Sequence, residues 1–269
     1  ARYSDGLGGF LDNRGLPNAW QYRDFVVNSF NADVPFDQFV RWQIAGELTP
    51  NAPLSARAGT GFFAVGPTYN GDGGDAEASA AARAETLSDR VDTFSRAFLG
   101  LTVACARCHD HKFDPVSIKD YYAIAGVFNN TSIADKPLAL DTIVRAYDDH
   151  QNKIKNFEKQ IKQLNDKIKK EKREITEEEK KKREEWTKDR DELRKSLPPK
   201  YATAHGLREN GSNNMHVAIR GDLRKKGEEV PRRFLEVISR DKTFNKKSGL
   251  LQLADSVVDR DNPLTSRVF

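Results

Sequence analysis

The chain has 269 residues, 38% of them hydrophobic and 31% charged, with a net charge of +4. This length allows one large or two modest domains. No apolar run approaches the roughly 18 residues of a membrane span, so we expect none. Residues 153–195 hold 17 Lys and Arg against 12 Asp and Glu, so the positive excess belongs to one segment. A solvated charge run of this kind does not indicate nucleic-acid binding.

The first part of the chain predicts a Gly-rich loop and two helices. Residues 1–17 are loop-like, and Asn18 is a candidate cap for a helix that runs to about Phe30. Pro35 ends that helix. A second helix should follow, with apolar side chains at helical spacing: Phe36, Phe39, Val40 and Ile44. We expect these aromatic side chains to form core.

Residues 71–75 form an acidic, Gly-rich stretch that predicts a loop. Asp72 and Asp75 could contact calcium, but the EF-hand spacing and its final Glu are absent. We therefore expect no calcium site here.

A long amphipathic helix is predicted over residues 85–104. Its apolar positions step by four and three residues along one face: Leu87, Val91, Phe94, Phe98 and Leu101. After Asp114 and Pro115, Ser117 and Asp120 form a predicted capping box for a helix that runs through Phe128.

Between these two helices lies the only pair of cysteines, in Cys105-Ala106-Arg107-Cys108-His109. This C-x-x-C-H pattern is the attachment signature of a c-type haem. Two thiols three positions apart can add to the two vinyl groups on one porphyrin edge, and the next His can ligate the iron. The sequence thus predicts one covalent haem held by Cys105, Cys108 and His109.

Two other chemistries remain open for this segment. Zinc could use Cys105, Cys108, His109 and His111, although zinc sites usually take ligands from two separated segments. A redox dithiol is the second alternative, but that motif normally opens a helix after a strand. Here the motif follows an amphipathic helix instead.

From residue 140 the pattern becomes that of a heptad seam. Its members step by four and three: Ile143, Tyr147, His150, Ile154, Phe157, Ile161, Leu164 and Ile168. Thr176 with Glu179 predicts a new helix start after a turn near 170–175, and Pro198-Pro199 ends that helix. We expect a projecting antiparallel coiled-coil hairpin, in which His150 is a packed, hydrogen-bonded side chain.

The last part of the chain predicts a small β element near 213–238. Residues 215–219 alternate in polarity, which is typical of a strand, and 234–238 is a second candidate strand. A short helix should cover 250–257. The expected fold class is therefore mainly α.

The remaining His and Met residues supply the candidates for the sixth iron position. His216 is the preferred ligand, with Met215 and His205 as alternatives, and an open position is also possible. His111 lies too close to His109 to reach the opposite face of the same iron. Arg107 is a candidate partner for a haem propionate.

Several segments together resemble the planctomycete cytochrome-c-associated family of unknown function called DUF1549 or PSCyt2. They are the opening Ala1-Arg2-Tyr3, residues 20–24, 35–39 and 45–46, and the stretch from Phe98 through Pro115 with Asp120-Tyr121-Tyr122. The resemblance covers about residues 1–130. Residues 248–267 resemble the start of a DUF1553 (PSD1) region. We expect a haem-binding domain over 1–138, a helical insertion over 139–199, a linking segment over 200–247 and a DUF1553-like start over 248–269.

This resemblance implies a haem and an exported, periplasmic or extracellular location, but no reaction. We expect a monohaem electron-transfer module in a larger exported assembly, of which this chain is a piece. A peroxidase or oxidoreductase using Arg107, Asp110, His111 and Asp114 for proton transfer is the second hypothesis. The third is an interaction module in which the haem acts as a staple. Expected partners are another redox protein or the rest of the parent polypeptide, with a coiled-coil partner bound through 140–197.

Overall fold

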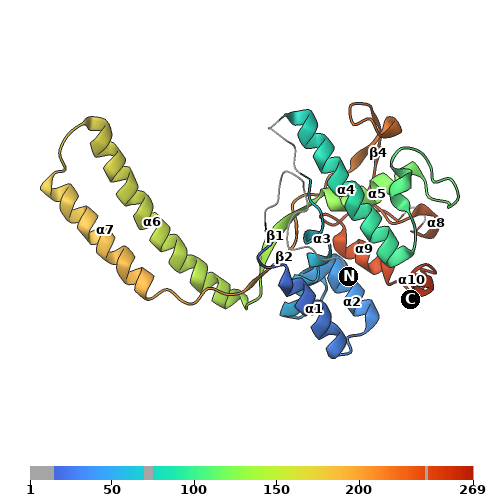
Figure 1. Cartoon of the computed structure of the whole chain (residues 1–269), viewed down its shortest axis with the longest axis horizontal. Helices are drawn as coiled ribbons and strands as arrows, with labels where there is room; N and C mark the ends of the chain where they lie inside the picture. The colour runs from blue at the N-terminus through green and yellow to red at the C-terminus, as the bar shows by residue number, and fades with distance from the viewer. Residues whose placement is uncertain (1–14, 70–74, 240–241, 269) are drawn as a thin grey trace. The chain divides into compact units, whose positions relative to one another are not determined.

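The computed structural model describes residues 15–69, 75–239 and 242–268 (Figure 1). It is mainly helical, with 58% helix, 11% strand and small antiparallel sheets, which confirms the predicted class. Two compact units are present. The first comprises Ala1–Leu138 and Thr203–Phe269, and the second comprises Ala139–Ala202.

The elements of the first unit are mostly short helices. In chain order its helices are α1 (Trp20–Asn31), α2 (Phe36–Ala45), η1 (Gly46–Leu48), η2 (Leu54–Ala58), α3 (Gly61–Ala64), α4 (Ala76–Leu99), η4 (Val103–Arg107), α5 (Ile118–Asn129), η5 (Ile219–Gly221), α8 (Glu236–Ser239), α9 (Leu250–Val257) and α10 (Thr265–Val268). Its strands are β1 (Thr131–Pro137), β2 (Thr203–Glu209), β3 (Met215–Ala218) and β4 (Lys226–Val230).

The core of the first unit is built around α4 and α5. The predicted stripe on α4 is buried from Leu87 to Phe98. The Phe94 ring lies 6.0 Å from that of Phe128 on α5, and the Phe63 ring of α3 lies 4.8 Å from Phe128. Aromatic contacts between distant segments therefore fix α4 against α5.

The bounds of α4 differ from the prediction at both ends. The helix begins at Ala76, because the Asp75 side chain accepts a hydrogen bond from Glu77 N–H and alanines that favour helix follow. It ends at Leu99, because Gly100 adopts the left-handed conformation with φ +64°. The Ser117 and Asp120 capping box at the start of α5 is confirmed.

The sequence analysis missed one sheet and placed another correctly. β1 and β2 pair antiparallel, from Thr131 opposite Glu209 to Pro137 opposite Thr203, and neither strand was predicted. β3 and β4 form the β element expected near 213–238. The candidate strand at 234–238 is wrong, because α8 occupies Glu236–Ser239.

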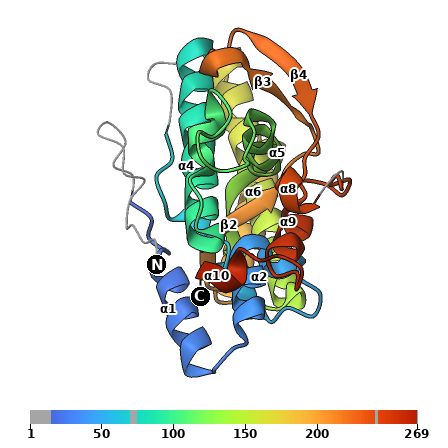
Figure 2. The same ribbon diagram turned by 90° about the vertical axis from the view of Figure 1, so that its right-hand side faces the viewer.

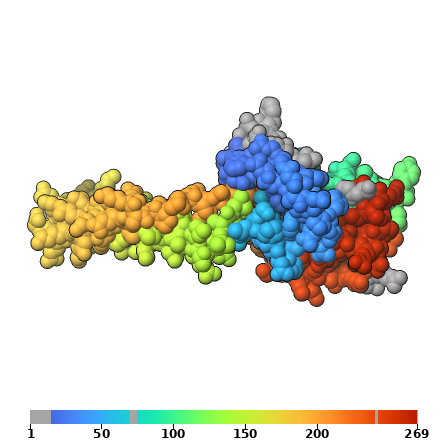
Figure 3. All heavy atoms as spheres, turned by 90° about the horizontal axis from the view of Figure 1, so that it is seen from below, coloured from blue at the N-terminus to red at the C-terminus, as the bar shows by residue number. Residues whose placement is uncertain are grey.

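Segments far apart in the chain close the first unit. α2 packs against α9, and Arg41 pairs with Asp255 between them. Figure 3 shows the blue N-terminal helices beside the red C-terminal segment on this face. Asn18 does not cap α1 as predicted, because its side chain donates to the Thr203 hydroxyl at 2.9 Å.

The second unit consists of α6 (Asp141–Glu171) and α7 (Glu177–Lys195). Lys172 ends α6 in the left-handed conformation, and the predicted capping box of Thr176 and Glu179 starts α7. The two helices contact each other, and an ion pair of 2.6 Å joins Glu158 and Arg194 between them. Ile154 is the one fully buried side chain of α6, and α7 buries none.

Candidate functional site

The C-x-x-C-H segment lies on the connection between α4 and α5 (Figure 2). After α4 ends at Leu99, the short helix η4 carries Cys105. Val103 and Ala106 are fully buried and fix η4 to the core. Because these two side chains point inward, Cys105 and Cys108 are left exposed as free thiols.

Cys108 is bounded on one side by the turn between β3 and β4. A Cβ added to Gly221 would lie 2.7 Å from the Cys108 Sγ, and Gly221 has φ +75°. Only glycine satisfies both conditions without strain. The structure therefore places a distant turn directly against the second cysteine.

His109 is exposed, and no described residue hydrogen-bonds its Nε2 ring nitrogen. Its Nδ1 lies 2.7 Å from the Asp110 carbonyl oxygen. A carbonyl can only accept, so Nδ1 carries a hydrogen, and in the neutral imidazole Nε2 is then the nitrogen with the lone pair. This is the hydrogen-bonding arrangement common to metal-ligating histidines.

His111 has a different role from His109, because both of its ring nitrogens are used within the loop. Nδ1 accepts from the Asp114 N–H at 2.9 Å, and Nε2 donates to the Thr102 hydroxyl at 3.0 Å. The side chain is largely buried. His111 thus braces the loop that follows the cysteines and is not free to ligate a metal.

Arg107 points toward α4 and pairs with Glu85 at 2.7 Å. Burial lowers its pKa, but the hydrogen bond and charge of Glu85 outweigh this and raise the pKa above the ordinary value. The Arg107 carbonyl also accepts from the Tyr122 hydroxyl at 3.2 Å. Sequence reasoning missed Glu85 and Tyr122, since nothing in the local pattern marks either as a neighbour of the motif.

The candidates for the sixth iron position fall into two groups. His205 donates from Nδ1 to Asp135 and accepts at Nε2 from the Asn18 N–H, so neither nitrogen is free. His216 donates from Nδ1 to the Gly227 carbonyl at 3.1 Å, and its Nε2 lies 3.9 Å from a carboxylate oxygen of Glu229, beyond hydrogen-bond distance. Met215 is partly buried against the core.

His216 also lies on a strand that leads to the motif. It belongs to β3, which is followed directly by η5 and Gly221, the residue against Cys108. The Tyr122 hydroxyl lies 3.5 Å from the Ala218 carbonyl in the same strand. The structure thus brings the 215–221 segment to the cysteine loop, while His150 lies in the second unit and contacts Ser196 at 3.3 Å.

The side chains of Cys105, Cys108 and His109 are suited to covalent haem attachment, but the described residues do not enclose a haem. A cavity of about 380 Å³ beside the motif is lined by acidic side chains such as Asp110, Asp114 and Glu236 and by neither cysteine. Apolar side chains instead lie exposed around the motif: Phe113, Ile219 and Leu223. A porphyrin held at this loop would need a cover from another surface.

Neither zinc nor calcium has a preformed site among the described residues. Within residues 15–69, 75–239 and 242–268, no three His, Cys, Asp or Glu side chains gather as a metal-binding group. The four zinc candidates of the sequence analysis therefore do not converge. Of the two calcium candidates, Asp72 lies outside the described residues and Asp75 caps α4.

The comparison with family models matches residues 1–133 to PSCyt2, described as a protein of unknown function (DUF1549). Residues 1–133 belong to the PSCyt2 family. The matched segment contains Cys105, Cys108 and His109 and ends within β1, so His216 and the second unit lie outside it. Comparisons with curated proteins and with solved structures gave no match. Across the described part of the chain, no helix combines the length and apolarity needed to cross a bilayer.

Proposed function

We propose that this PSCyt2 chain carries one c-type haem and acts as an electron-transfer module of a larger exported assembly. One observation carries the proposal. Two free, exposed thiols and a His109 ring with a free Nε2 stand together on one loop that buried side chains hold in place.

Cys105 and Cys108 would hold the group through thioether bonds. Each S–H adds across one vinyl C=C, with sulfur bonding to one carbon and hydrogen to the other, so no oxidant is needed. His109 would ligate the iron through Nε2. The bound haem would supply a site for reversible one-electron transfer.

His216 is the preferred sixth ligand in this proposal. Its Nε2 makes no hydrogen bond with the described residues, although the exposed carboxylate of Glu229 lies 3.9 Å away. His216 also lies on the strand that leads to Gly221, whereas the ring nitrogens of His111 and His205 are hydrogen-bonded. Two imidazole ligands favour electron transfer, because no iron position is left for substrate.

The exposed apolar side chains at the motif support a haem that is shared with a partner surface. Phe113 is 84% exposed, an unusual state for phenylalanine. A redox partner or the remainder of the parent polypeptide would cover this surface. The helix pair would form a coiled coil for docking, since its seam buries only Ile154 within α6.

A haem enzyme with an open position has less support. The four side chains expected to move protons are already engaged. Arg107 pairs with Glu85, Asp110 accepts from the Ile118 N–H, and His111 and Asp114 bind within the same loop. None of them is free to serve a substrate.

The pyridine haemochrome spectrum tests the proposal. Protein from a host competent for haem ligation should give the spectrum of a haem with two thioether bonds. Cys105→Ser and Cys108→Ser should each change it to that of one thioether, and the double variant should retain no haem after denaturation. His150→Gln serves as the control, because His150 lies in the second unit. A haem that denaturation removes from the unmodified chain would contradict the proposal.

Carbon monoxide then distinguishes the two haem functions. The reduced protein should not bind it when His216 occupies the sixth position, and His216→Ala should bind it readily. Binding by the unmodified protein at the same rate as by His216→Ala would favour the open-site enzyme.

A further inference from the structure

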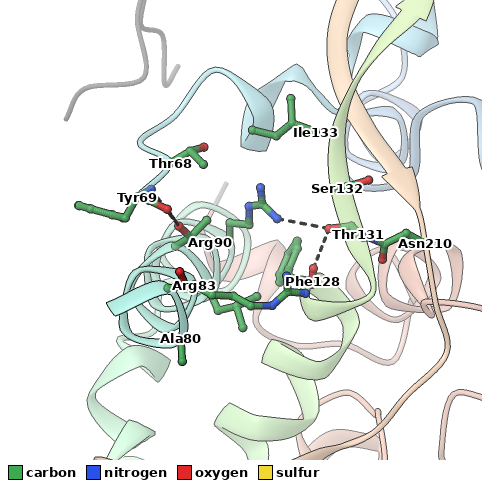
Figure 4. Close-up of a pocket in the computed structure, with 13 residues that line it drawn as sticks. Thr68, Tyr69, Ala80, Arg83, Arg90, Phe128, Thr131, Ser132, Ile133 and Asn210 are labelled. Carbon is green, nitrogen blue, oxygen red and sulfur yellow. Dashed lines mark hydrogen bonds between the residues drawn. The ribbon is translucent and has the colours of Figure 1, made fainter. Parts of the chain in front are cut away.

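A cavity of about 570 Å³ is lined by residues of α4 and β1 (Figure 4). Arg83, Thr86 and Arg90 follow one another at three- and four-residue spacing, so they share one face of the helix. Glu85, which contacts Arg107, lies about 200° around the helix from Arg83. One helix thus serves two separate surfaces.

The central feature of this cavity is a buried arginine with little to bind. Arg90 is 5% exposed, and its Nη1 donates to the Thr131 hydroxyl at 3.3 Å. Its buried Nε has no hydrogen-bond acceptor among the described residues. Figure 4 shows the side chain reaching from α4 into the space between Thr68, Ile133 and Thr131.

Burial lowers the pKa of Arg90 to about 10, and the charge of Asp89 partly opposes this. The guanidinium therefore remains charged at neutral pH. A buried cation without a hydrogen-bonded anion is costly, and buried charges are normally paired. We therefore expect an anion from outside the described chain to bind Arg90.

The other residues that line the cavity also favour an anionic ligand. None of the thirteen described lining residues is acidic, and six of them carry hydroxyl groups. The Thr68 hydroxyl is also buried, without a hydrogen-bond partner among the residues that the structure describes. Arg83 adds a second positive charge at an exposed position, held by Asn129 at 2.9 Å. Leu87, Phe128 and Ile133 supply apolar surface.

We propose that this cavity binds a small hydroxylated organic oxyanion, a carboxylate or a phosphate ester, with Arg90 as its buried cationic partner. Guanidinium groups bind both kinds of anion through paired hydrogen bonds. The cavity is within the usual size range of small-molecule sites and larger than a bare phosphate needs. The hydroxyl-rich lining matches a ligand with several hydroxyl groups.

Calorimetric titration of the full chain with glucuronate, glucose 6-phosphate and neutral glucose tests the proposal. We expect saturable binding of at least one of the two anions and none of glucose. Binding of glucuronate alone assigns a carboxylate ligand, and binding of glucose 6-phosphate alone assigns a phosphate ester. Arg90→Met should weaken the binding by about tenfold or more.

Arg96→Gln is the matched control, because Arg96 lies on the same helix but is exposed and paired with Asp92. It should leave the affinity unchanged. Arg83→Gln, at an exposed position, should weaken binding several-fold and keeps the test valid if Arg90→Met fails to fold. Absence of saturable binding of both anions would overturn the proposal, as would equal affinities in the unmodified chain, Arg90→Met and Arg83→Gln.

Thermal unfolding without ligand separates a binding role from a structural one. Replacing an unpaired buried charge by an apolar side chain of similar length should keep or raise the unfolding temperature. A large fall in Arg90→Met would show that Arg90 also supports the fold, and the binding test then passes to Arg83→Gln. Equal affinities of Arg83→Gln and the unmodified chain would in that case overturn the proposal.

Discussion

The two units of this chain are both helical, yet they are stabilised in different ways. The first buries a connected set of aromatic and aliphatic side chains between segments far apart in sequence, and one ion pair of Asp120 and Arg233 is buried with them. The second buries only Ile154 and depends on helix caps and exposed charge pairs. Long-range packing therefore determines the first unit, and local interactions determine the second.

The buried ion pair should give the largest effect. Asp120 accepts from Arg233 at 2.5 Å and from the N–H groups of Ser117 and Glu236. Asp120→Ala leaves the buried guanidinium with only the exposed carboxylate of Glu236 as an ionic partner and leaves two N–H groups without their acceptor. We therefore expect a loss of about 3–5 kcal/mol in the free energy of unfolding. Denaturant titration measures it. Glu228→Gln, which removes the exposed pair with Lys119, should change little, and equal losses in the two variants would refute the contrast.

Gly221→Ala should give the next largest effect. The substitution places a Cβ against the Cys108 sulfur at a position with φ +75°, so we expect a loss of roughly 1–3 kcal/mol in unfolding free energy. Gly227→Ala is the control, because its Cβ would meet only ordinary contacts of 3.4 Å or more. If both variants unfold at the same denaturant concentration, the turn does not constrain Cys108.

The two capping boxes allow a direct comparison of the units. Ser117→Ala and Thr176→Ala each remove a cap worth about 1 kcal/mol. The first should lower the global stability of the first unit, because α5 lies in its core. The second should increase hydrogen exchange only in the first turn of α7. Faster hydrogen exchange throughout the first unit of Thr176→Ala would contradict a purely local role of this cap.

Lowering the pH should have the smallest effect, at the start of α7. The hydrogen bond from Arg173 is the main cause that lowers the pKa of Glu179 from 4.5 to about 2. Because the folded-state pKa is lowered, the stabilisation is complete above pH 4.5 and is lost as the pH falls toward 2. Hydrogen exchange at the start of α7 should rise over this range. Glu179→Gln should remove this pH dependence of hydrogen exchange, and Glu178→Gln should keep it.

This contrast also explains what could be predicted from the sequence. The caps at Ser117 and Thr176 and the stripe on α4 were predictable, because each is a local pattern of a few residues. β1 and β2 were missed, because each strand is completed only by a partner some 70 residues away. The α4 ends were misplaced since Asp75 and Gly100 were not recognised as its caps.

The residues of the candidate site also differ in whether local sequence predicts them. The cysteines and His109 were found from adjacent residues, whereas Gly221, Glu85 and Tyr122 contact the motif only in the folded chain. Arg90 gave no signal at all, because an arginine on an amphipathic helix normally faces solvent. Its burial depends on β1, which the sequence did not predict.

Intact mass spectrometry under denaturing conditions tests the central claim most directly. The chain should be produced in a host that ligates c-type haem and unfolded before measurement. The account predicts the mass of the polypeptide plus one haem, and the polypeptide mass alone for the Cys105→Ser, Cys108→Ser double variant. The bare polypeptide mass for the unmodified chain would contradict it.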